Sequence, residues 1–279
     1  MKRFSDLRYR ACYLALSLAG SIGFTSYAPA QRYDPAQQYA PAQRPVSDST
    51  TVAEQYLLAA ANQERAALGL RPLHRDPLLA SAAVQHAERM AEHSGISHQF
   101  PGEAELTERA ASAGVRFSVV SENVGEAPSA VQIHDMWMHS EGHRTNLLDP
   151  AVDAVGISVI PRGRELYAVE DFAKTVQALS LEQQESAIAS LVAQPGVNVI
   201  ANSDTVSAAR RTCAMSTGYA GTQKPWFVMR FTSDSVGVLP AELKTRIASG
   251  RYHQAVVGAC STGGDGPFTA YNIAVLLYP

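Results

Sequence analysis

This sequence of 279 residues has few cysteines, no excess of basic charge and no long apolar run beyond its first residues. Its three cysteines allow at most one disulfide. The net charge of -3 provides no basic surface of the kind that binds nucleic acid or an anionic membrane. No later stretch is apolar enough to cross a bilayer. Soluble partners or substrates are therefore expected.

The first 30 residues have the pattern of a secretory signal peptide. A short apolar run over residues 11–24 is followed by the small residues 28–30, and the basic residues in front of and beside the run are Lys2, Arg3, Arg8 and Arg10. The run is too short for a membrane-spanning helix, which needs roughly 20 apolar residues. The sequence therefore predicts cleavage after residue 30 and a secreted or periplasmic protein.

Residues 31–50 are rich in proline, alanine and glutamine, and the triplet Pro-Ala-Gln recurs there. Spaced prolines and few large aliphatic residues favour extended, solvated chain. The segment is interpreted as a linker, and a peptide ligand is the alternative.

Removal of the leader also removes Cys12, so that Cys213 and Cys260 are the only cysteines left. An even pair in an exported chain predicts one disulfide, and two unrelated buried thiols are the alternative. A bridge across a loop of this length stabilises the folded state by roughly 4 kcal/mol.

Helical patterns precede strand patterns over residues 51–175. Capping signals and apolar spacing predict helices over residues 51–69, 76–95, 105–113 and 129–140. Two strand-like segments, residues 155–160 and 166–169, are joined by a turn and predict a hairpin. Helices followed by an antiparallel meander indicate an α+β domain.

Residues 176–279 are expected to form a smaller, mixed α/β domain. A helix from Ser180 to residues 195–196 is followed by the strand candidates 197–201, 227–231, 255–259 and 269–277, with helical stretches at 205–213 and 241–249. This part has one histidine, His253, and no catalytic motif.

Seven of the eight histidines lie between residues 74 and 143. Imidazole is the commonest metal ligand and titrates near neutral pH, so this crowding raises the odds of a metal or acid-base site. A single histidine in such a segment is nevertheless more often a surface or hydrogen-bonded residue.

A series of short motifs is more specific than this crowding. In order along the chain they are Ile96-Ser97-His98, Ser121-Glu122-Asn123-Val124-Gly125, the block from Trp137 to Leu148, Val155-Gly156-Ile157, and a segment that ends in Asp171-Phe172. The series resembles the bacterial branch of the CAP superfamily, named after cysteine-rich secretory, antigen five and pathogenesis-related proteins. The resemblance covers residues 51–175 and implies an α-β-α sandwich.

The resemblance also implies a central cleft in which two histidines and an acidic residue can hold a divalent metal. The matching residues are His98, His143 and Glu122, and two imidazoles with one carboxylate suit zinc. Ser140 stands where the eukaryotic branch of the family places a second glutamate, which puts paired-carboxylate catalysis in doubt. Residues expected to support the cleft are Asn123, Ser140, Arg144 and Asn146.

Two other interpretations of these residues stay open. Glu122 and the histidines could simply hydrogen-bond one another and fix the loops of the cleft. Alternatively, Ser140, His143 and Glu122 could serve as nucleophile, base and orienting acid, although the strained turn that exposes such serines is missing.

The sequence therefore favours an exported binding or interaction module over an enzyme, with an extracellular or cell-envelope ligand that it does not identify. A metal-dependent or serine-type extracellular hydrolase is the first alternative. A lipid or sterol carrier is the second, although no sequence feature marks the groove that it needs.

Overall fold

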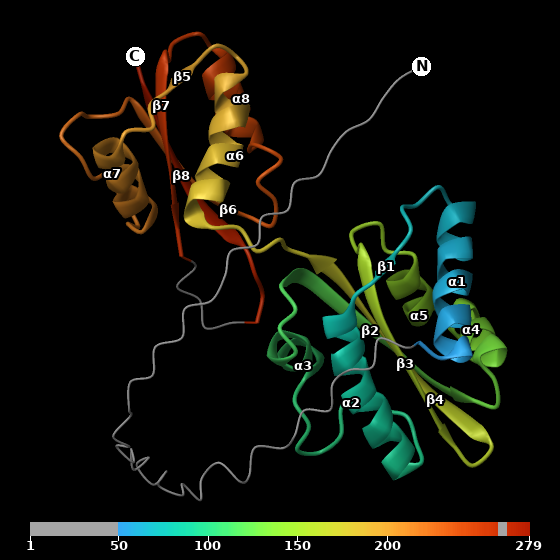
Figure 1. The fold of residues 1–279 in the computed structure, drawn as a ribbon. Coiled ribbons are helices and arrows are strands. Elements are labelled where there is room, and N and C mark those ends of the chain that lie inside the picture. Colours follow the sequence, from blue (N-terminus) through green and yellow to red (C-terminus); the bar gives the residue numbers. More distant parts are fainter. Residues whose placement is uncertain (1–49, 262–266) are drawn as a thin grey trace, which may run out of the picture. The chain divides into compact units, whose positions relative to one another are not determined.

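The computed structural model describes residues 50–261 and 267–279. The predicted signal peptide and nearly all of the predicted linker lie outside these residues. The described part contains two four-stranded sheets with helices on both faces of each (Figure 1). The expected α+β class is confirmed. The sheets share no strand, and the domain boundary at residues 175–176 stays a prediction.

The first sheet has the strand order β1-β3-β4-β2. The short edge strand β1 (His74–Arg75) runs parallel to β3 (Ala154–Arg162), and β3 forms a hairpin with β4 (Glu165–Thr175). On the other side of β4 lies the antiparallel strand β2 (Phe117–Ala127). Because β4 is central, its residues are paired on both sides and lie in the middle of the sandwich.

Helix α2 (Pro77–His93) covers one face of this sheet. It begins as predicted, since Asp76 accepts hydrogen bonds from the backbone amides of Leu78 and Leu79 and proline occupies the first turn. Its alanines and Met90 pack against Val124, Tyr167 and Val169. The small alanine side chains allow the helix to lie close to the strands.

Helices α1 (Val52–Ala67) and α4 (Ala130–His139) cover the opposite face. The predicted capping box of α1 is present, with Thr51 and Glu54 bonded reciprocally. Trp137 of α4 is buried in the core against α1 and the sheet, and its indole donates to the carbonyl of Val124. Its role is therefore packing.

One strand of the first sheet and one of the helices that pack near it differ from the sequence expectation. Strand β2 carries the Glu122-Asn123 motif but lacks a regular alternation of polar and apolar residues, so it was not predicted. The fourth helix stops at His139, and a separate helix α5 (Glu141–Leu147) begins after Ser140, whose backbone is extended. The two helices therefore place their side chains independently.

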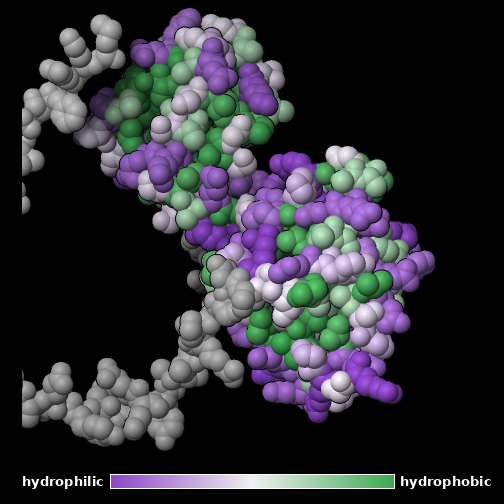
Figure 2. Space-filling model, turned by 45° about the vertical axis from the view of Figure 1, so that its right-hand side comes forward, coloured by the Kyte–Doolittle hydropathy of each residue, from purple (hydrophilic) through white to green (hydrophobic). Residues whose placement is uncertain are grey.

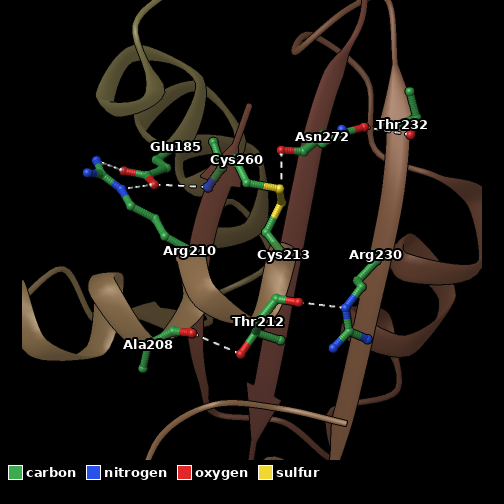
Figure 3. Close-up of a disulfide and its surroundings, with 10 residues drawn as sticks. Glu185, Ala208, Arg210, Thr212, Cys213, Arg230, Thr232, Cys260 and Asn272 are labelled. Carbon is green, nitrogen blue, oxygen red and sulfur yellow. Dashed lines mark hydrogen bonds and ion pairs between the residues drawn. A yellow bond between two sulfur atoms is a disulfide. The ribbon is translucent and has the colours of Figure 1, made fainter. Parts of the chain in front are cut away.

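The second sheet has the strand order β5-β7-β8-β6. Its strands are β5 (Asn198–Val199), β7 (Gln254–Cys260), β8 (Tyr271–Tyr278) and β6 (Phe227–Ser233). Helices α6 (Leu181–Ala193) and α8 (Ala241–Ala248) pack on one face, and α7 (Ser203–Cys213) packs on the other. The predicted disulfide between Cys213 and Cys260 is confirmed and joins the end of α7 to the end of β7 (Figure 3).

Polar residues cover much of the visible surface, with hydrophobic residues interspersed (Figure 2). Large exposed hydrophobic side chains include Val52 and Leu68 at the two ends of α1 and Trp226 just before β6. No helix within residues 50–261 and 267–279 is long and apolar enough to cross a membrane.

Candidate functional site

The residues expected at the site come from three segments around the sandwich. His98 lies in the loop after α2, Glu122 and Asn123 lie on β2, and His143 lies on α5. Nδ1 of His98 is 2.8 Å from Oε1 of Glu122. The glutamate is buried, whereas 63% of the His98 side chain is exposed. The hydrogen bond to the buried glutamate thus fixes one edge of the imidazole, and the rest of the ring faces solvent.

Two asparagines fasten α5 to β2. Asn123 donates to the backbone carbonyl of His143 over 3.1 Å. Asn146 donates to the carbonyl of Glu122 and to Oδ1 of Asn123, each over 3.1 Å. Asn123 and Asn146 therefore set the position of the helix that carries His143.

Arg65 of α1 fastens the other end of α5. Its buried guanidinium donates to the carbonyls of Leu147, Asp149 and Val152. These carbonyls lie at the end of α5 and in the segment after it, where backbone acceptors lack helical partners. The helix is held at both ends, so the position of His143 is set by the fold.

Arg109 lies beneath the site and was not anticipated. It extends from α3 (Leu106–Ser112) and donates to Oε2 of Glu122 and to the carbonyls of His98 and Ala104. Only 4% of its side chain is exposed. One buried cation thus neutralises Glu122 and also holds the backbone of His98.

A second histidine-carboxylate pair lies behind Glu122. Nδ1 of His86 is 2.7 Å from Oε1 of Glu103, and Nε2 of His86 is 2.7 Å from the carbonyl of Ser97. Both ring nitrogens thus face acceptors, so a proton must lie between Nδ1 and the carboxylate. This pair anchors the segment that leads to His98.

Strand β4 adds two buried carboxyl groups. Asp171 lies directly opposite Glu122 in the sheet, and Glu170 lies opposite Asn123. Burial raises the pKa of Glu170 to about 8, and burial together with the negative charge of Glu122 raises the pKa of Asp171 well above its ordinary value. A second carboxyl group is therefore present beside Glu122, although Ser140 fills the position where one was sought.

The two imidazoles of the site differ in electrostatics. The hydrogen bond to Glu122 raises the pKa of His98, despite partial burial. Burial and the nearby His98 lower the pKa of His143. His143 therefore loses its proton at lower pH than His98 and is the better metal ligand in mildly acidic solution.

A pocket of about 310 Å³ opens beside His98. Its other lining residues are Gln99, Glu105, Leu106, Thr107 and Glu122. A pocket of this size lies at the low end of the range for small-molecule sites. His143 does not line it, so the pocket adjoins only the His98 side of the site.

The remaining expected residues take structural positions. Ser140 occupies the break between α4 and α5 and makes no side-chain cap bond. Among the hydrogen bonds of the described residues, none joins Ser140 to His143, and Glu122 bonds His98 and Arg109 instead. Arg144 donates to the carbonyl of Met138, a local contact that closes the motif block.

The metal assignment stays a prediction. In residues 50–261 and 267–279, no group of three or more histidine, cysteine, aspartate or glutamate side chains is arranged to hold a metal ion. Both oxygens of Glu122 are engaged, one by His98 and one by Arg109. Nε2 of His98 and the ring of His143 are the donors that best fit an added cation.

Replacement of Glu170 by glutamine is expected to remove part of the pH dependence of stability. Since burial raises its pKa in the folded state, folding takes up a proton, and stability falls as pH rises from about 4.5 towards 8. Between pH 5 and 7 the wild type should lose about 1.4 kcal/mol per pH unit relative to Glu170→Gln. Urea unfolding at each pH measures the difference.

The exposed Glu92→Gln is the matched control and should follow the wild type. Parallel pH profiles of the wild type and Glu170→Gln would contradict the raised pKa.

The comparisons with known proteins support the motif series. The model of the cysteine-rich secretory protein family, CAP, matches residues 58–172. This segment is a CAP domain. The match includes His98, Glu122 and His143 and ends at Phe172, so it covers the first sheet and not the second.

Two curated relatives from Bacillus subtilis match the CAP domain. The uncharacterized protein YkwD is 28% identical over 116 residues, which are 41% of this chain and 45% of the relative. The uncharacterized membrane protein YlbC is 32% identical over 113 residues, which are 39% of this chain and 32% of the relative. The matched region thus spans less than half of each relative.

A solved structure of an extracellular protein that contains an SCP domain, from Bacillus anthracis, is also similar. It is 26% identical, covers 44% of this chain and 40% of its own chain, and has a TM-score of 0.41.

Proposed function

We propose that this chain is an exported binding protein whose CAP domain presents a two-imidazole site, His98 and His143, to an extracellular or cell-envelope ligand. The hydrogen bond between His98 and Glu122 carries the proposal. A carboxylate on Nδ1 fixes the tautomer of a neutral imidazole and leaves Nε2 free to bind. Glu122 then orients the ring of His98 and is not itself a binding group.

A divalent metal such as zinc fits the donor atoms that are free. Nε2 of His98 and the ring of His143 would hold it, and the metal would supply a Lewis-acid centre with open positions for a ligand. Arg109 donates to Oε2 of Glu122, and Oε1 of the same carboxylate faces Nδ1 of His98. Asn123 keeps His143 in place through the backbone of α5.

Binding is favoured over turnover because the described residues provide no assembled nucleophile. Ser140 has no hydrogen bond to His143, and Asp171 is buried beneath Glu122. The hydrolase alternative predicts turnover of esters or peptides that is lost in His143→Ala.

Export is supported by the predicted leader and by the disulfide, since disulfides persist in oxidising compartments.

Zinc titration of the purified full-length chain tests the proposal. Zinc is expected to shift the imidazole NMR signals of His98 and His143, more strongly as pH rises through the raised pKa of His98. His98→Ala and His143→Ala should each weaken binding at least about tenfold, because each removes a ligand. Glu122→Gln should weaken it by roughly 10–100-fold through loss of orientation.

His139→Ala is the control, since this histidine lies on α4 and 79% of its side chain is exposed. It should leave zinc binding unchanged. Imidazole signals of His98 and His143 that do not respond to zinc would contradict the metal proposal.

A further inference from the structure

We infer that residues 180–278 are a second copy of the CAP fold, reduced in size and without the site that the first copy carries. The family match ends at residue 172, so it does not include this part. Both parts run helix, two-residue strand, helix, strand, helix and hairpin. The first copy adds only the short helices α3 and α5 to this order.

The strands are also connected and paired in the same way. If the four strands of each sheet are numbered in chain order, their order across the sheet is first, third, fourth, second in both sheets. In each sheet the first strand is parallel to the third, and the fourth is antiparallel to both of its neighbours. In both copies helices cover both faces of the sheet (Figure 1): α2 and α7 pack on one face, and α1 with α4, or α6 with α8, pack on the opposite face. Agreement in order, direction and layering together defines one fold.

The helix starts repeat as well. Helices α1 and α6 each begin with a capping box, at Thr51 and at Ser180. Helices α2 and α7 each follow the two-residue strand and begin with a side-chain cap, from Asp76 and from Asn202. The same local signals thus start the same elements in both copies.

A glycine marks the same close contact in both sheets. A Cβ atom on Gly156 of β3 would lie 2.1 Å from the backbone carbon of Leu79 in α2. A Cβ atom on Gly258 of β7 would lie 2.3 Å from the backbone carbon of Ala209 in α7. Neither position admits a side chain, because helix backbone lies directly against the third strand.

In each copy, a glutamate of the first helix accepts a hydrogen bond from a backbone amide of the third strand. Glu54 of α1 accepts from the backbone amide of Val159 over 3.1 Å. Glu185 of α6 accepts from the amide of Ala259 over 2.9 Å. Both amides belong to the strand that the two-residue edge strand covers only in part.

The glycines align the site positions of the two sheets. Gly156 pairs with Asp171, which pairs with Glu122. In the second sheet, Gly258 pairs with Ala274, which pairs with Arg230. An arginine thus occupies the position of the site glutamate, and alanine replaces the buried aspartate. In the next row, Ile273 and Phe231 occupy the positions of Glu170 and Asn123.

The histidine positions are lost with the carboxylates. Counted from the caps Asp76 and Asn202, Thr212 of α7 occupies the position of His86, so no imidazole lies there. Cys213 ends the shortened helix and is bonded to Cys260. Arg230 donates to the carbonyl of Thr212 in the last turn of α7, as Figure 3 shows, and to the carbonyl of Gly218 beyond the helix. A covalent bond and an arginine thus secure the helix end in place of the longer helix.

The second copy therefore lacks, at the aligned positions, the histidine and carboxylate groups of the first site. Its only histidine, His253, precedes β7 and is exposed. This inference does not depend on what the first copy binds.

NMR spectroscopy of the deuterated full-length chain tests both parts of the inference. Interstrand NOEs should pair β8 with both β6 and β7, antiparallel, and β5 with β7, parallel. Pairing of β6 with β7, or β5 elsewhere, would overturn the shared fold.

Zinc is the probe for the lost site. No zinc-dependent shift is expected at Arg230, Ala274 or His253, whether or not His98 and His143 respond. A saturable shift at these residues would overturn the loss of the site, whereas silence at His98 and His143 would contradict only the proposed function.

Discussion

Replacement of Arg109 by methionine is expected to lower the free energy of unfolding by about 3–5 kcal/mol. The arginine is the buried cation that contacts Glu122, and its loss leaves this carboxylate next to Asp171 and near Glu103 without compensation. It also frees the carbonyls of His98 and Ala104. Chemical denaturation followed by circular dichroism measures the loss.

Arg89→Met is the matched control, because 45% of the Arg89 side chain is exposed and it lies 4.0 Å from Glu103. It should cost less than about 1 kcal/mol. Addition of Glu122→Gln to Arg109→Met should restore part of the stability, since it removes the uncompensated charge. Equal losses in Arg109→Met and Arg89→Met would show that Arg109 does not neutralise the site.

Loss of the disulfide should have an effect of similar size on the other half of the chain. Cys213 and Cys260 are separated by 47 positions, and the chain-entropy model gives about 4 kcal/mol for a loop of this length. The double variant Cys213→Ala/Cys260→Ala is therefore expected to unfold residues 180–279 at lower denaturant than the wild type. Hydrogen exchange resolved by region measures where protection is lost.

The wild type under reducing conditions is the control and should behave like the double variant. Protection in the first sheet should change little in either case, because the disulfide lies wholly within the second sheet's elements. Uniform loss of protection over both sheets would contradict this local effect.

Much of the fold could be predicted because its signals are local. The capping boxes at Thr51 and Ser180, the Asp76-Pro77 start and the hairpin each depend on a few neighbouring residues. Strand β2 could not be predicted in this way, since its central residues serve the site and interrupt the alternation that marks a strand. The two-residue strand β1 is too short to leave a periodic pattern, whereas β5 lies within the predicted strand at residues 197–201.

The site could be predicted only where its residues carry the family motifs. His98 and Glu122 share a hydrogen bond, which is one of the contacts expected if these residues fix the loops of the cleft. Asn123 and Asn146 bind the backbone of α5 and of β2. Arg109 was missed because its partner Glu122 lies on another element. A signal existed for His86, which stands at a position of α2 where the helical period predicts an apolar residue.

The shared topology was also beyond the reach of sequence reasoning. Its evidence lies in strand order and in the alignment of Gly156 with Gly258, whereas the residues at the other aligned positions differ in charge and polarity. A similarity can be recognised in the sequence only where the side chains are alike. The two sheets share mainly backbone contacts and strand order.

The carboxylates of Glu54 and Glu185 have a consequence for self-association. Each binds an amide of a strand whose outer edge is covered by only two residues of β1 or β5. An open strand edge is a template onto which a strand from another molecule can add. An acidic side chain that already occupies an edge amide blocks this addition. Both sheets of this chain are in this way protected against edge-to-edge aggregation at their least covered strand.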